Sequence, residues 1–320
     1  MRLCGLLVQT RFARVCSMLC ITDFLVQNDV SAECIELVNL LGKCTETVAK
    51  ILAQTPVVSV GTRNAFGDHQ LSVDVLADSA IFSLLESSSV VGHAASEEEP
   101  VVRSCGAGEF VVCFDPLDGS SIVDCNWAVG SIFGVWPGTT PVGKCGRDQI
   151  LCAVSVYGPR TTMFVGIAEK ALAFEAIYHE TIWKVIVPKI EISNVPITIF
   201  SPANLRATSE LPGYAKLVDS WIKQKLTLRY TGGMVPDVCG ILTKKNGIFC
   251  SPVSPSAPAK LRLVFECAPI ALLVEIAGGF AFGGLEGPVL DSSIASMDDR
   301  TGFICGSPNA VLSVRDCIYQ

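Results

Sequence analysis

The spacing of apolar residues predicts two helices in the first quarter of the chain. Between Ser31 and Ala53 apolar positions recur every three or four residues, and Ser31 precedes them as a candidate N-cap. A second helical pattern runs from Leu76 to Leu85. The first pattern is that of an amphipathic helix, which buries its apolar stripe against a core.

Short runs of branched and aromatic residues predict strands through the middle of the chain. Glycine and proline turns separate these runs, which indicates one large mixed sheet. The predicted strands are residues 110–114, 131–136, 150–157, 161–167, 171–177 and 182–187.

A change of composition near residues 196–202 predicts a domain boundary. The elements expected beyond it are a helix at 214–225, a strand ending at Arg229 and Tyr230, a helix from Pro236 onward and an apolar helix after Glu266. The predicted parts are an N-terminal extension of residues 1–20, a first domain of residues 21–198 and a second of residues 199–320. The extension has arginines but no acidic residue, so a targeting segment and an ordinary N-terminal segment both remain open.

Composition and charge disfavour two classes of partner. Half of the 320 residues are apolar and the mean hydropathy is +0.47, which raises the question of a membrane protein. No apolar stretch approaches the roughly 18 residues of a spanning helix, so we expect no membrane span. A net charge of −7 disfavours nucleic acid and anionic membrane surfaces, because both are bound through clustered Lys and Arg.

The cysteine content indicates a reducing compartment. The chain has 15 cysteines and only three histidines, and the cysteines form no CxxC pair. This pattern favours free, mostly buried thiols over a disulfide framework or a zinc site. We therefore expect a cytoplasmic protein, with the plastid interior, which is also reducing, as the alternative.

The strongest candidate for chemistry follows the predicted strand at residues 110–114. Asp115 and Asp118 flank Pro116, which cannot continue a β-ladder, and Gly119 allows a sharp turn. Two carboxylates about 4 Å apart repel by about 4 kcal/mol at an effective dielectric near 20, so a cation between them would be favourable. Oxygen ligands select a hard ion such as Mg²⁺ or Mn²⁺. A surface turn is the competing interpretation of this segment alone.

Residues around this turn could complete a phosphate site. The Leu117 carbonyl is a further oxygen ligand, and the run Gly119, Ser120 and Ser121 offers N–H groups and hydroxyls to an anion. The acidic run Glu97, Glu98 and Glu99 could share the same site, although such a run also suits a solvated loop. Asp68 suits a helix cap and Asp74 an exposed helical position. The cations that could bind a phosphate are Arg229, Lys260 and Arg262.

Together these motifs resemble those of the sugar bisphosphatases of the lithium-sensitive phosphatase superfamily, which includes fructose-1,6-bisphosphatase. The resemblance rests on Asp115-Pro-Leu-Asp118-Gly-Ser-Ser with Asp68, Asp74, Glu97 and Glu98 before it, and it covers about residue 21 to the C-terminus. Five longer strings are most similar to the branch of the family that acts on sedoheptulose 1,7-bisphosphate. They are residues 136–138, 157–162, 200–208, 228–237 and 297–301.

The resemblance implies a role for each candidate residue. The implied metal ligands are Glu97, Asp115, Asp118, Glu266 and the Leu117 carbonyl. The residues implied to activate the attacking water are Asp74 and Glu98, with Asp68 assisting. The implied substrate contacts are Gly119, Ser120 and Ser121 for the departing phosphate, and Asn204, Arg229, Tyr230, Lys260 and Arg262 for the distal phosphate and the sugar.

The resemblance also implies the fold, the reaction and the assembly. It implies an α/β protein built as a layered α-β-α-β-α sandwich, with a metal-binding first domain and a sugar-phosphate-binding second domain. The implied reaction is hydrolysis of the 1-phosphate of sedoheptulose 1,7-bisphosphate, to sedoheptulose 7-phosphate, by water that two or three Mg²⁺ ions activate, with Mn²⁺ as a substitute. Alternatives are the six-carbon fructose 1,6-bisphosphate, both substrates, or a catalytically idle sensor of sugar phosphates. The family arginine matching Arg229 reaches a neighbouring subunit, which implies a homo-oligomer, a dimer or a tetramer.

Three departures from the family pattern bear on substrate and regulation. No tyrosine stands about ten residues before Lys260, where fructose bisphosphatases have one, so we expect a differently shaped sugar pocket. The cysteine pair of plant plastid relatives is missing ahead of Asp68, which disfavours thioredoxin control at that place. Glu109 and Phe110 occupy the place of a Lys-Tyr pair, which disfavours inhibition by AMP.

Overall fold

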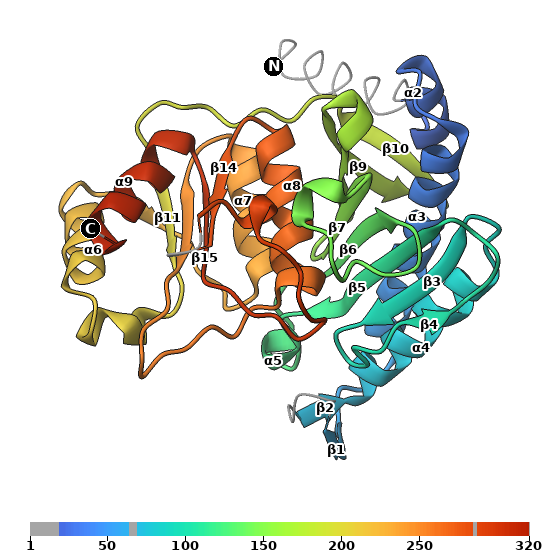
Figure 1. Ribbon diagram of the computed structural model, residues 1–320, viewed down its shortest axis with the longest axis horizontal. Coiled ribbons are helices and arrows are strands. Elements are labelled where there is room, and N and C mark those ends of the chain that lie inside the picture. The colour runs from blue at the N-terminus through green and yellow to red at the C-terminus, as the bar shows by residue number, and fades with distance from the viewer. Residues whose placement is uncertain (1–18, 64–68, 284–286, 320) are drawn as a thin grey trace, which may run out of the picture.

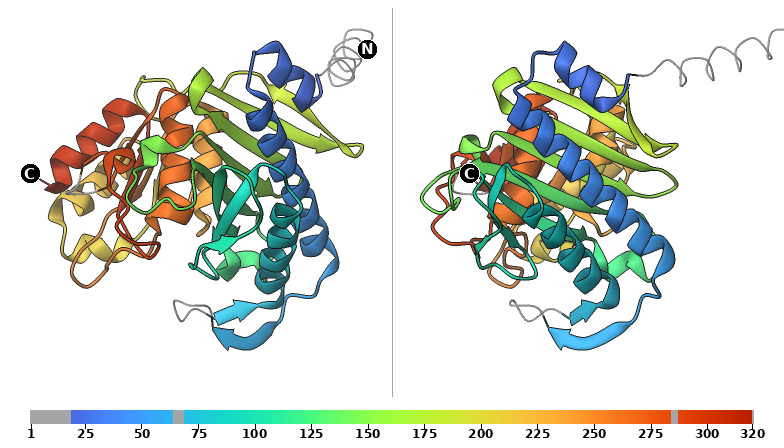
Figure 2. Two further views of the ribbon diagram at one scale, coloured as in Figure 1. Left: turned by 45° about the vertical axis from the view of Figure 1, so that its right-hand side comes forward. Right: turned by 90° about the vertical axis from the view of Figure 1, so that its right-hand side faces the viewer.

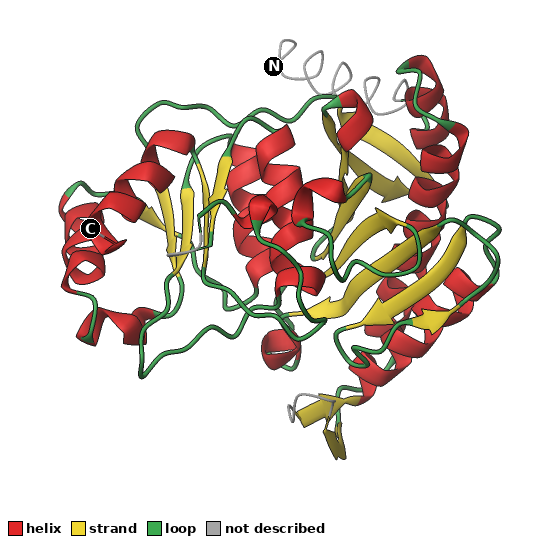
Figure 3. Cartoon of the chain, viewed as in Figure 1, coloured by secondary structure: helices red, strands yellow, loops and turns green. Residues whose placement is uncertain are grey.

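Two β-sheets with a layer of helices between them form the framework of the molecule (Figure 1). The computed structural model describes residues 19–63, 69–283 and 287–319. Helices also cover the outer face of each sheet, so the layers run helix, sheet, helix, sheet, helix (Figures 1 and 3). The predicted α-β-α-β-α sandwich is therefore confirmed.

The large sheet has eight strands in the order β10-β9-β8-β7-β6-β5-β3-β4. Among the described strands of this sheet, only β3 and β5 are parallel neighbours, so the predicted mixed sheet is confirmed. The strands are β3 (Val91–Ser96), β4 (Arg103–Ser104), β5 (Phe110–Asp118), β6 (Val129–Pro137), β7 (Leu151–Tyr157), β8 (Thr161–Ile167), β9 (Leu172–His179) and β10 (Ile182–Val187).

Two long helices cover the outer face of this sheet (Figure 2). They are α3 (Ala32–Gln54) and α4 (Ser72–Glu86), and the short α2 (Ile21–Gln27) precedes them. The predicted amphipathic stripe of α3 is confirmed, because Leu37, Leu41 and Val48 are fully buried against the sheet. Ser31 occupies the N-cap position of α3, but its side chain makes no capping hydrogen bond.

The inner face of the large sheet packs against α7 (Met234–Lys244) and α8 (Ala268–Ile276). On their far side lies a five-stranded sheet, which α6 (Pro212–Lys223) and α9 (Pro308–Tyr319) cover in turn. The order of this sheet is β12 (Thr227–Leu228), β11 (Ile199–Pro202), β13 (Ile248–Ser251), β15 (Phe303–Gly306) and β14 (Phe280–Phe282).

The remaining elements are short. A two-stranded ribbon, β1 (Ser59–Arg63) and β2 (His69–Leu71), projects from the body of the molecule (Figure 1), and α5 (Ser120–Val123) follows β5. A π-helical turn, η4 (Leu263–Cys267), leads into α8. The 3-10 turns are η1 (Gly146–Asp148), η2 (Ala168–Lys170), η3 (Leu205–Ser209) and η6 (Val289–Asp291).

Several boundaries differ from those expected from the sequence, and three of them lie close to the candidate site. Strand β5 was expected to end at Phe114 but runs through Asp118, because β6 continues to pair with Asp115 and Asp118 across an irregular step at Pro116 and Leu117. Strand β12 ends at Leu228, before the predicted Arg229 and Tyr230. Helix α7 begins two residues before Pro236, which fits a proline tolerated in the first helical turn.

Two expectations about the whole chain concern membranes and thiols. Among the described residues no helix is long and apolar enough to cross a membrane. All the cysteines in the described ranges are free, and most of them are buried. The division into parts at residues 20 and 198 stays a prediction.

Candidate active site

The alternating pattern of β5 directs Asp115 toward the middle helical layer. Val111 and Cys113 pack into the core that the large sheet shares with α7 and α8, whereas Val112 and Phe114 pack into the core under α3 and α4. Successive side chains of a strand point to opposite faces, so Asp115 continues the inward series. It is 4 % exposed, and its Oδ1 accepts a hydrogen bond from the Leu117 N–H at 2.9 Å.

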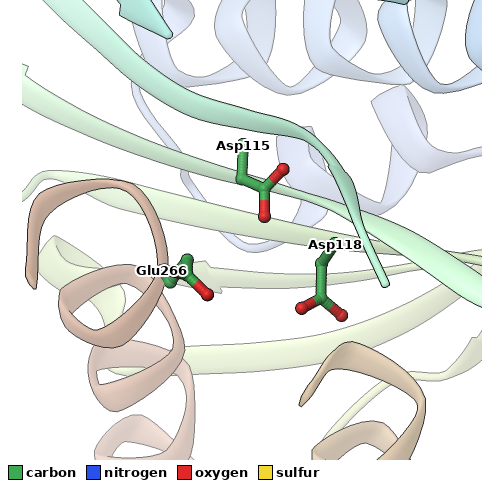
Figure 4. A group of neighbouring side chains, drawn as sticks. All are labelled: Asp115, Asp118 and Glu266. Carbon is green, nitrogen blue, oxygen red and sulfur yellow. The ribbon is translucent and has the colours of Figure 1, made fainter. Parts of the chain in front are cut away.

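Three buried carboxylates converge where β5 meets η4 and α7 (Figure 4). One oxygen from each of Asp115, Asp118 and Glu266 lies within 4.8 Å of the others. Glu266 comes from the π-helical turn η4, and its Oε2 accepts the backbone N–H of Arg262. Such single-turn π-helices are frequent at functional sites. Three hard oxygen donors in this arrangement form a candidate site for a divalent cation.

Asp118 is positioned by the N-terminus of α7. Its Oδ2 accepts the Val235 N–H at 2.7 Å and its Oδ1 accepts the Met234 N–H at 3.2 Å. The first N–H groups of a helix have no partner within the helix and favour a negative charge. Directly after Asp118 the chain turns at Gly119, whose φ of +87° is a left-handed conformation that glycine adopts without strain, and α5 begins.

Glu97 extends the cluster from the neighbouring strand. It follows β3, which runs parallel to β5, and its N–H donates to the Phe114 carbonyl at 2.9 Å. Its Oε1 lies 3.2 Å from Nη1 of Arg262, which is itself buried. Only 16 % of the Glu97 side chain is exposed. The structure therefore brings all four predicted acidic metal ligands to one place.

Burial and mutual repulsion raise the pKa of every acid in this cluster. For Asp115 and Glu266 the pKa lies well above its ordinary range, first because of burial and then because of the neighbouring carboxylates. Burial also raises the pKa of Glu97, although Arg262 opposes that shift. The pKa of Asp118 rises to about 6, since burial outweighs the hydrogen bonds from α7. A cation that these oxygens surround would relieve this repulsion.

A second acidic group lies next to the cluster on α4. Asp74 is 3 % exposed, its Oδ2 accepts the Leu71 N–H at 2.9 Å, and its buried Oδ1 has no hydrogen-bond partner. Burial, with the charges of Glu98 and Glu97, raises its pKa to about 7. The pKa of Asp78, one helical turn later, rises to about 6, because of burial and the charge of Glu98. Asp68 lies outside the described residues.

A cavity of about 290 Å³ joins this site to the second half of the chain. Asp118 and Ser121 contribute to its wall from the turn after β5, and Tyr230 and Lys260 contribute from the C-terminal part. Arg206, which the sequence analysis did not single out, also lines it. The cavity therefore combines a carboxylate of the acidic cluster with two cationic side chains.

Three of the residues implied to bind the distal phosphate or the sugar differ from Tyr230 and Lys260 in their surroundings. Asn204 lines the cavity, but both hydrogens of its side-chain amide are directed to the carbonyls of Pro252 and Ala257. Arg262 faces Glu97 and is not among the lining residues. Arg229 is exposed and likewise lies outside the cavity lining.

A buried hydrogen-bond chain behind the β5 turn was also not predicted. The Ser131 hydroxyl donates to the Pro116 carbonyl at 2.7 Å, and the Tyr157 hydroxyl contacts Ser131 at 2.7 Å. Since Ser131 has one hydrogen, Tyr157 acts as the donor to it. This chain fixes the irregular step of β5 between Asp115 and Asp118. Ser131 and Tyr157 are 26 positions apart in the sequence. Their contact depends on the pairing of β6 with β7, so no local motif predicts this chain of hydrogen bonds.

Comparisons with known proteins agree with this fold. Residues 20–178 match the model of the fructose-1-6-bisphosphatase N-terminal domain, and residues 195–319 match the model of its C-terminal domain. The chain is 43 % identical over 301 residues to the chloroplastic sedoheptulose-1,7-bisphosphatase of Triticum aestivum, covering 93 % of this chain and 76 % of that protein. It is 33 % identical to the class 1 fructose-1,6-bisphosphatase of Geobacter sulfurreducens, covering 90 % of this chain and 92 % of that protein.

Solved structures give the same result. A crystal structure of a candidate sedoheptulose-1,7-bisphosphatase from Toxoplasma gondii superposes with a TM-score of 0.88 at 39 % identity, covering 94 % of this chain and 98 % of that one. Fructose-1,6-bisphosphatase of Leishmania major in its holo form gives a TM-score of 0.86 at 27 % identity, with coverages of 94 % and 99 %.

The chain belongs to the fructose-1,6-bisphosphatase family. It is an enzyme, a phosphatase that hydrolyses sugar bisphosphates, and its family is generally metal dependent. The predicted family and enzyme class are thus confirmed. The individual residue roles, the metal ions and the substrate stay predictions.

Proposed function

We propose that the protein hydrolyses the 1-phosphate of sedoheptulose 1,7-bisphosphate in a reaction that requires Mg²⁺. The observation that carries this proposal is the single cavity lined by both Asp118 of the acidic cluster and Lys260 of the C-terminal part. A bisphosphate needs a cation-binding cluster for the phosphate that leaves and a basic group for the phosphate that stays. Both kinds of group line this cavity.

The donor set suits two or three Mg²⁺ ions, with Mn²⁺ as a substitute. Buried carboxylates with raised pKa values and a backbone carbonyl are hard oxygen ligands, and these ions prefer such ligands. When bound, the ions neutralise phosphate oxygens, lower the pKa of water and stabilise the leaving alkoxide. The residues that would hold them are Glu97, Asp115, Asp118, Glu266 and the Leu117 carbonyl.

Asp74 accepts the proton of the attacking water in this proposal. Its Oδ2 is engaged by the Leu71 N–H, which leaves the buried Oδ1 as the basic atom. A pKa near 7 suits a general base that works at neutral pH. Glu98 supports Asp74, with Asp68 as the predicted assistant. Attack is in line at phosphorus, and no phosphoenzyme forms.

The turn after β5 binds the departing phosphate. Gly119 adopts its left-handed conformation there, so the N–H groups and hydroxyls of Ser120 and Ser121 follow Asp118 directly. Ser121 lines the cavity. An anion bound here would be adjacent to the metal ligand Asp118.

Preference for the seven-carbon substrate rests on similarity to relatives that carry that name. Identity is 43 % to the wheat sedoheptulose-1,7-bisphosphatase and 33 % to the bacterial fructose-1,6-bisphosphatase. Paired kcat/KM values for sedoheptulose 1,7-bisphosphate and fructose 1,6-bisphosphate test this preference. We expect a ratio of about ten or more in favour of the longer sugar, because one carbon in a pocket discriminates by about 1 to 3 kcal/mol. Equal values would indicate an enzyme that acts on both substrates, and reversed values would indicate a fructose-1,6-bisphosphatase.

The active enzyme is a homo-oligomer, a dimer or a tetramer, in this proposal. Arg229 is exposed and lies outside its own chain's cavity lining, which agrees with a role across a subunit contact. Light scattering of the purified protein tests the assembly.

The proposed location is the cytoplasm, with the plastid as the alternative. A fluorescent fusion of the full chain, expressed in its own cell, distinguishes the two.

A further inference from the structure

Asn204 cannot donate a hydrogen bond to a phosphate in this structure. Its side-chain nitrogen donates to the Pro252 carbonyl at 2.7 Å and to the Ala257 carbonyl at 3.1 Å. Both partners are acceptors, so the group that faces them must be the NH₂, and its two hydrogens are used. The remaining Oδ1 is buried without a partner, and as an acceptor it would repel phosphate oxygens. Asn204 therefore anchors the segment 252–257.

Arg206 lines the same cavity two residues later. It belongs to η3, which begins directly after Asn204, and its side chain is exposed to the cavity. Within the described residues no ion pair involves its guanidinium. Arg206 and Tyr230 line the cavity together, and the charge of Arg206 opposes the rise in the pKa of Tyr230 that burial and Asp237 cause. A cation in a cavity without a protein counter-ion is available to an anionic ligand.

The backbone that carries Arg206 is well supported. Asn204 adopts a left-handed φ of +49° and accepts the Ala207 N–H at 2.9 Å through its carbonyl. Ala207 is fully buried, so Arg206 lies on the outward side of an anchored turn. Glu210, at the end of the same turn, accepts hydrogen bonds from the Ser256 N–H and hydroxyl. Arg206 is therefore presented from the same support that fixes the segment 252–257.

We propose that Arg206 binds the distal phosphate of the sugar bisphosphate, together with Lys260 and Tyr230, and that Asn204 is a positioning residue for this subsite. A guanidinium offers paired N–H donors that match two oxygens of a phosphate, whereas an ammonium offers a point charge. Arg206 and Lys260 together supply two positive charges for the phosphate dianion. This inference rests on the proposed function, since it names the group that binds the phosphate left on the sugar.

Binding of the reaction product tests the inference without turnover. Sedoheptulose 7-phosphate carries only the distal phosphate, and calorimetric titration in excess chelator removes any metal-held contact. We expect Arg206→Ala to weaken binding by about ten- to a hundredfold, the size of a hydrogen bond to a charged group. Arg206→Lys should restore part of the affinity, and Arg160→Ala, an exposed arginine at the β7–β8 turn, should leave it unchanged.

Kinetics give the second measurement. For sedoheptulose 1,7-bisphosphate, Arg206→Ala should raise KM by about tenfold or more while kcat stays within about twofold, because the distal phosphate takes no part in bond breaking. Wild-type affinity for the product in Arg206→Ala, or no binding by the wild type, would overturn the inference. If the wild type binds the product through Arg206 yet hydrolyses neither bisphosphate, the inference stands and the proposed function fails.

Discussion

Asp118 differs from its neighbouring carboxylates in what holds it. Asp115 and Glu266 each accept one backbone N–H, whereas Asp118 accepts two from the start of α7. These bonds keep the carboxylate ionised more readily than burial alone would allow, which is why its pKa rises only to about 6. Asp118 also lines the cavity of about 290 Å³. In the proposed mechanism it is therefore the carboxylate that would link the metal ligands to the substrate.

Replacement of Asp118 tests the metal site. We expect Asp118→Asn to lower kcat by at least about a hundredfold, the order that follows from losing a main electrostatic contribution to the transition state. The amide keeps the shape of the side chain but loses one of the two acceptors for the N–H groups of α7, so circular dichroism should be unchanged while the free energy of unfolding falls by about 1 to 3 kcal/mol. Steady-state kinetics over a range of Mg²⁺ concentrations gives the result. Turnover close to that of the wild type would remove Asp118 from the metal site.

Residues near one another in the sequence were the predictable part of the site. Asp115 and Asp118 share a turn, and Glu97 follows a strand that ends beside them, so local motifs locate all three. No local motif marks Arg206. Its place in the cavity depends on the tertiary contacts between β11, β13 and the segment after β13. The anchoring role of Asn204 was hidden for the same reason, since its partners lie 48 and 53 positions away.

At the scale of elements, the close packing of α7 on β6 positions Asp118. Gly130 of β6 pairs with Asp118 of β5, and a Cβ at Gly130 would overlap the side chain of Val235 and the carbonyl of Ser155. Val235 supplies the shorter N–H bond to Asp118. The absence of a side chain at Gly130 thus lets the start of α7 reach the carboxylate.

A methyl group at Gly130 should move α7 away from the sheet. We expect Gly130→Ala to lower the free energy of unfolding by about 1 to 3 kcal/mol through overpacking. Its kcat should fall by about tenfold or more, because a misplacement of about 1 Å can cost about a hundredfold. Denaturant unfolding and steady-state kinetics measure the two effects.

The matched control is Gly240→Ala in the same helix. A Cβ at Gly240 would meet no atom within 4 Å, so this change should add about 0.5 to 1 kcal/mol of stability and leave kcat unchanged. If Gly130→Ala behaved like Gly240→Ala, the packing of α7 would have no part in positioning Asp118.

Element type could be predicted from the sequence more securely than element ends. The apolar stripe of α3 and the runs of the large sheet gave the right elements, because burial of one face or of a whole strand determines their composition. The predicted end of β5 was wrong, because Pro116 and the two aspartates have the composition of a turn. The strand continues through them because it pairs with β6, and the local sequence pattern does not show this pairing.

At the scale of the whole molecule, five layers place the carboxylates in the interior, and this should make stability depend on pH and metal. Burial raises the pKa of Asp118 to about 6 and that of Asp74 to about 7, from an ordinary value near 3.8. Between these values the folded state binds more protons than the unfolded state, so stability without metal is present at low pH and is lost as pH rises. Bound Mg²⁺ should offset this loss.

Thermal unfolding in chelator and in Mg²⁺ checks this expectation. In chelator we expect Tm to be lower at pH 8 than at pH 5.5, and the increase in Tm on adding Mg²⁺ to be larger at pH 8, because the ligands must lose their protons to bind the ion. NaCl at matched ionic strength controls for screening. An equal increase at both pH values would contradict the assignment of the carboxylate cluster as the metal site.

The most direct test of the account is phosphate release from sedoheptulose 1,7-bisphosphate by the purified enzyme, with Mg²⁺ and with excess chelator, followed by identification of the sugar product. The account predicts rapid release with Mg²⁺, almost none in chelator, and sedoheptulose 7-phosphate as the product. Release that persists in chelator would contradict the metal site. Formation of the 1-phosphate would mean that the acidic cluster and the cationic wall of the cavity have been assigned to the wrong ends of the substrate.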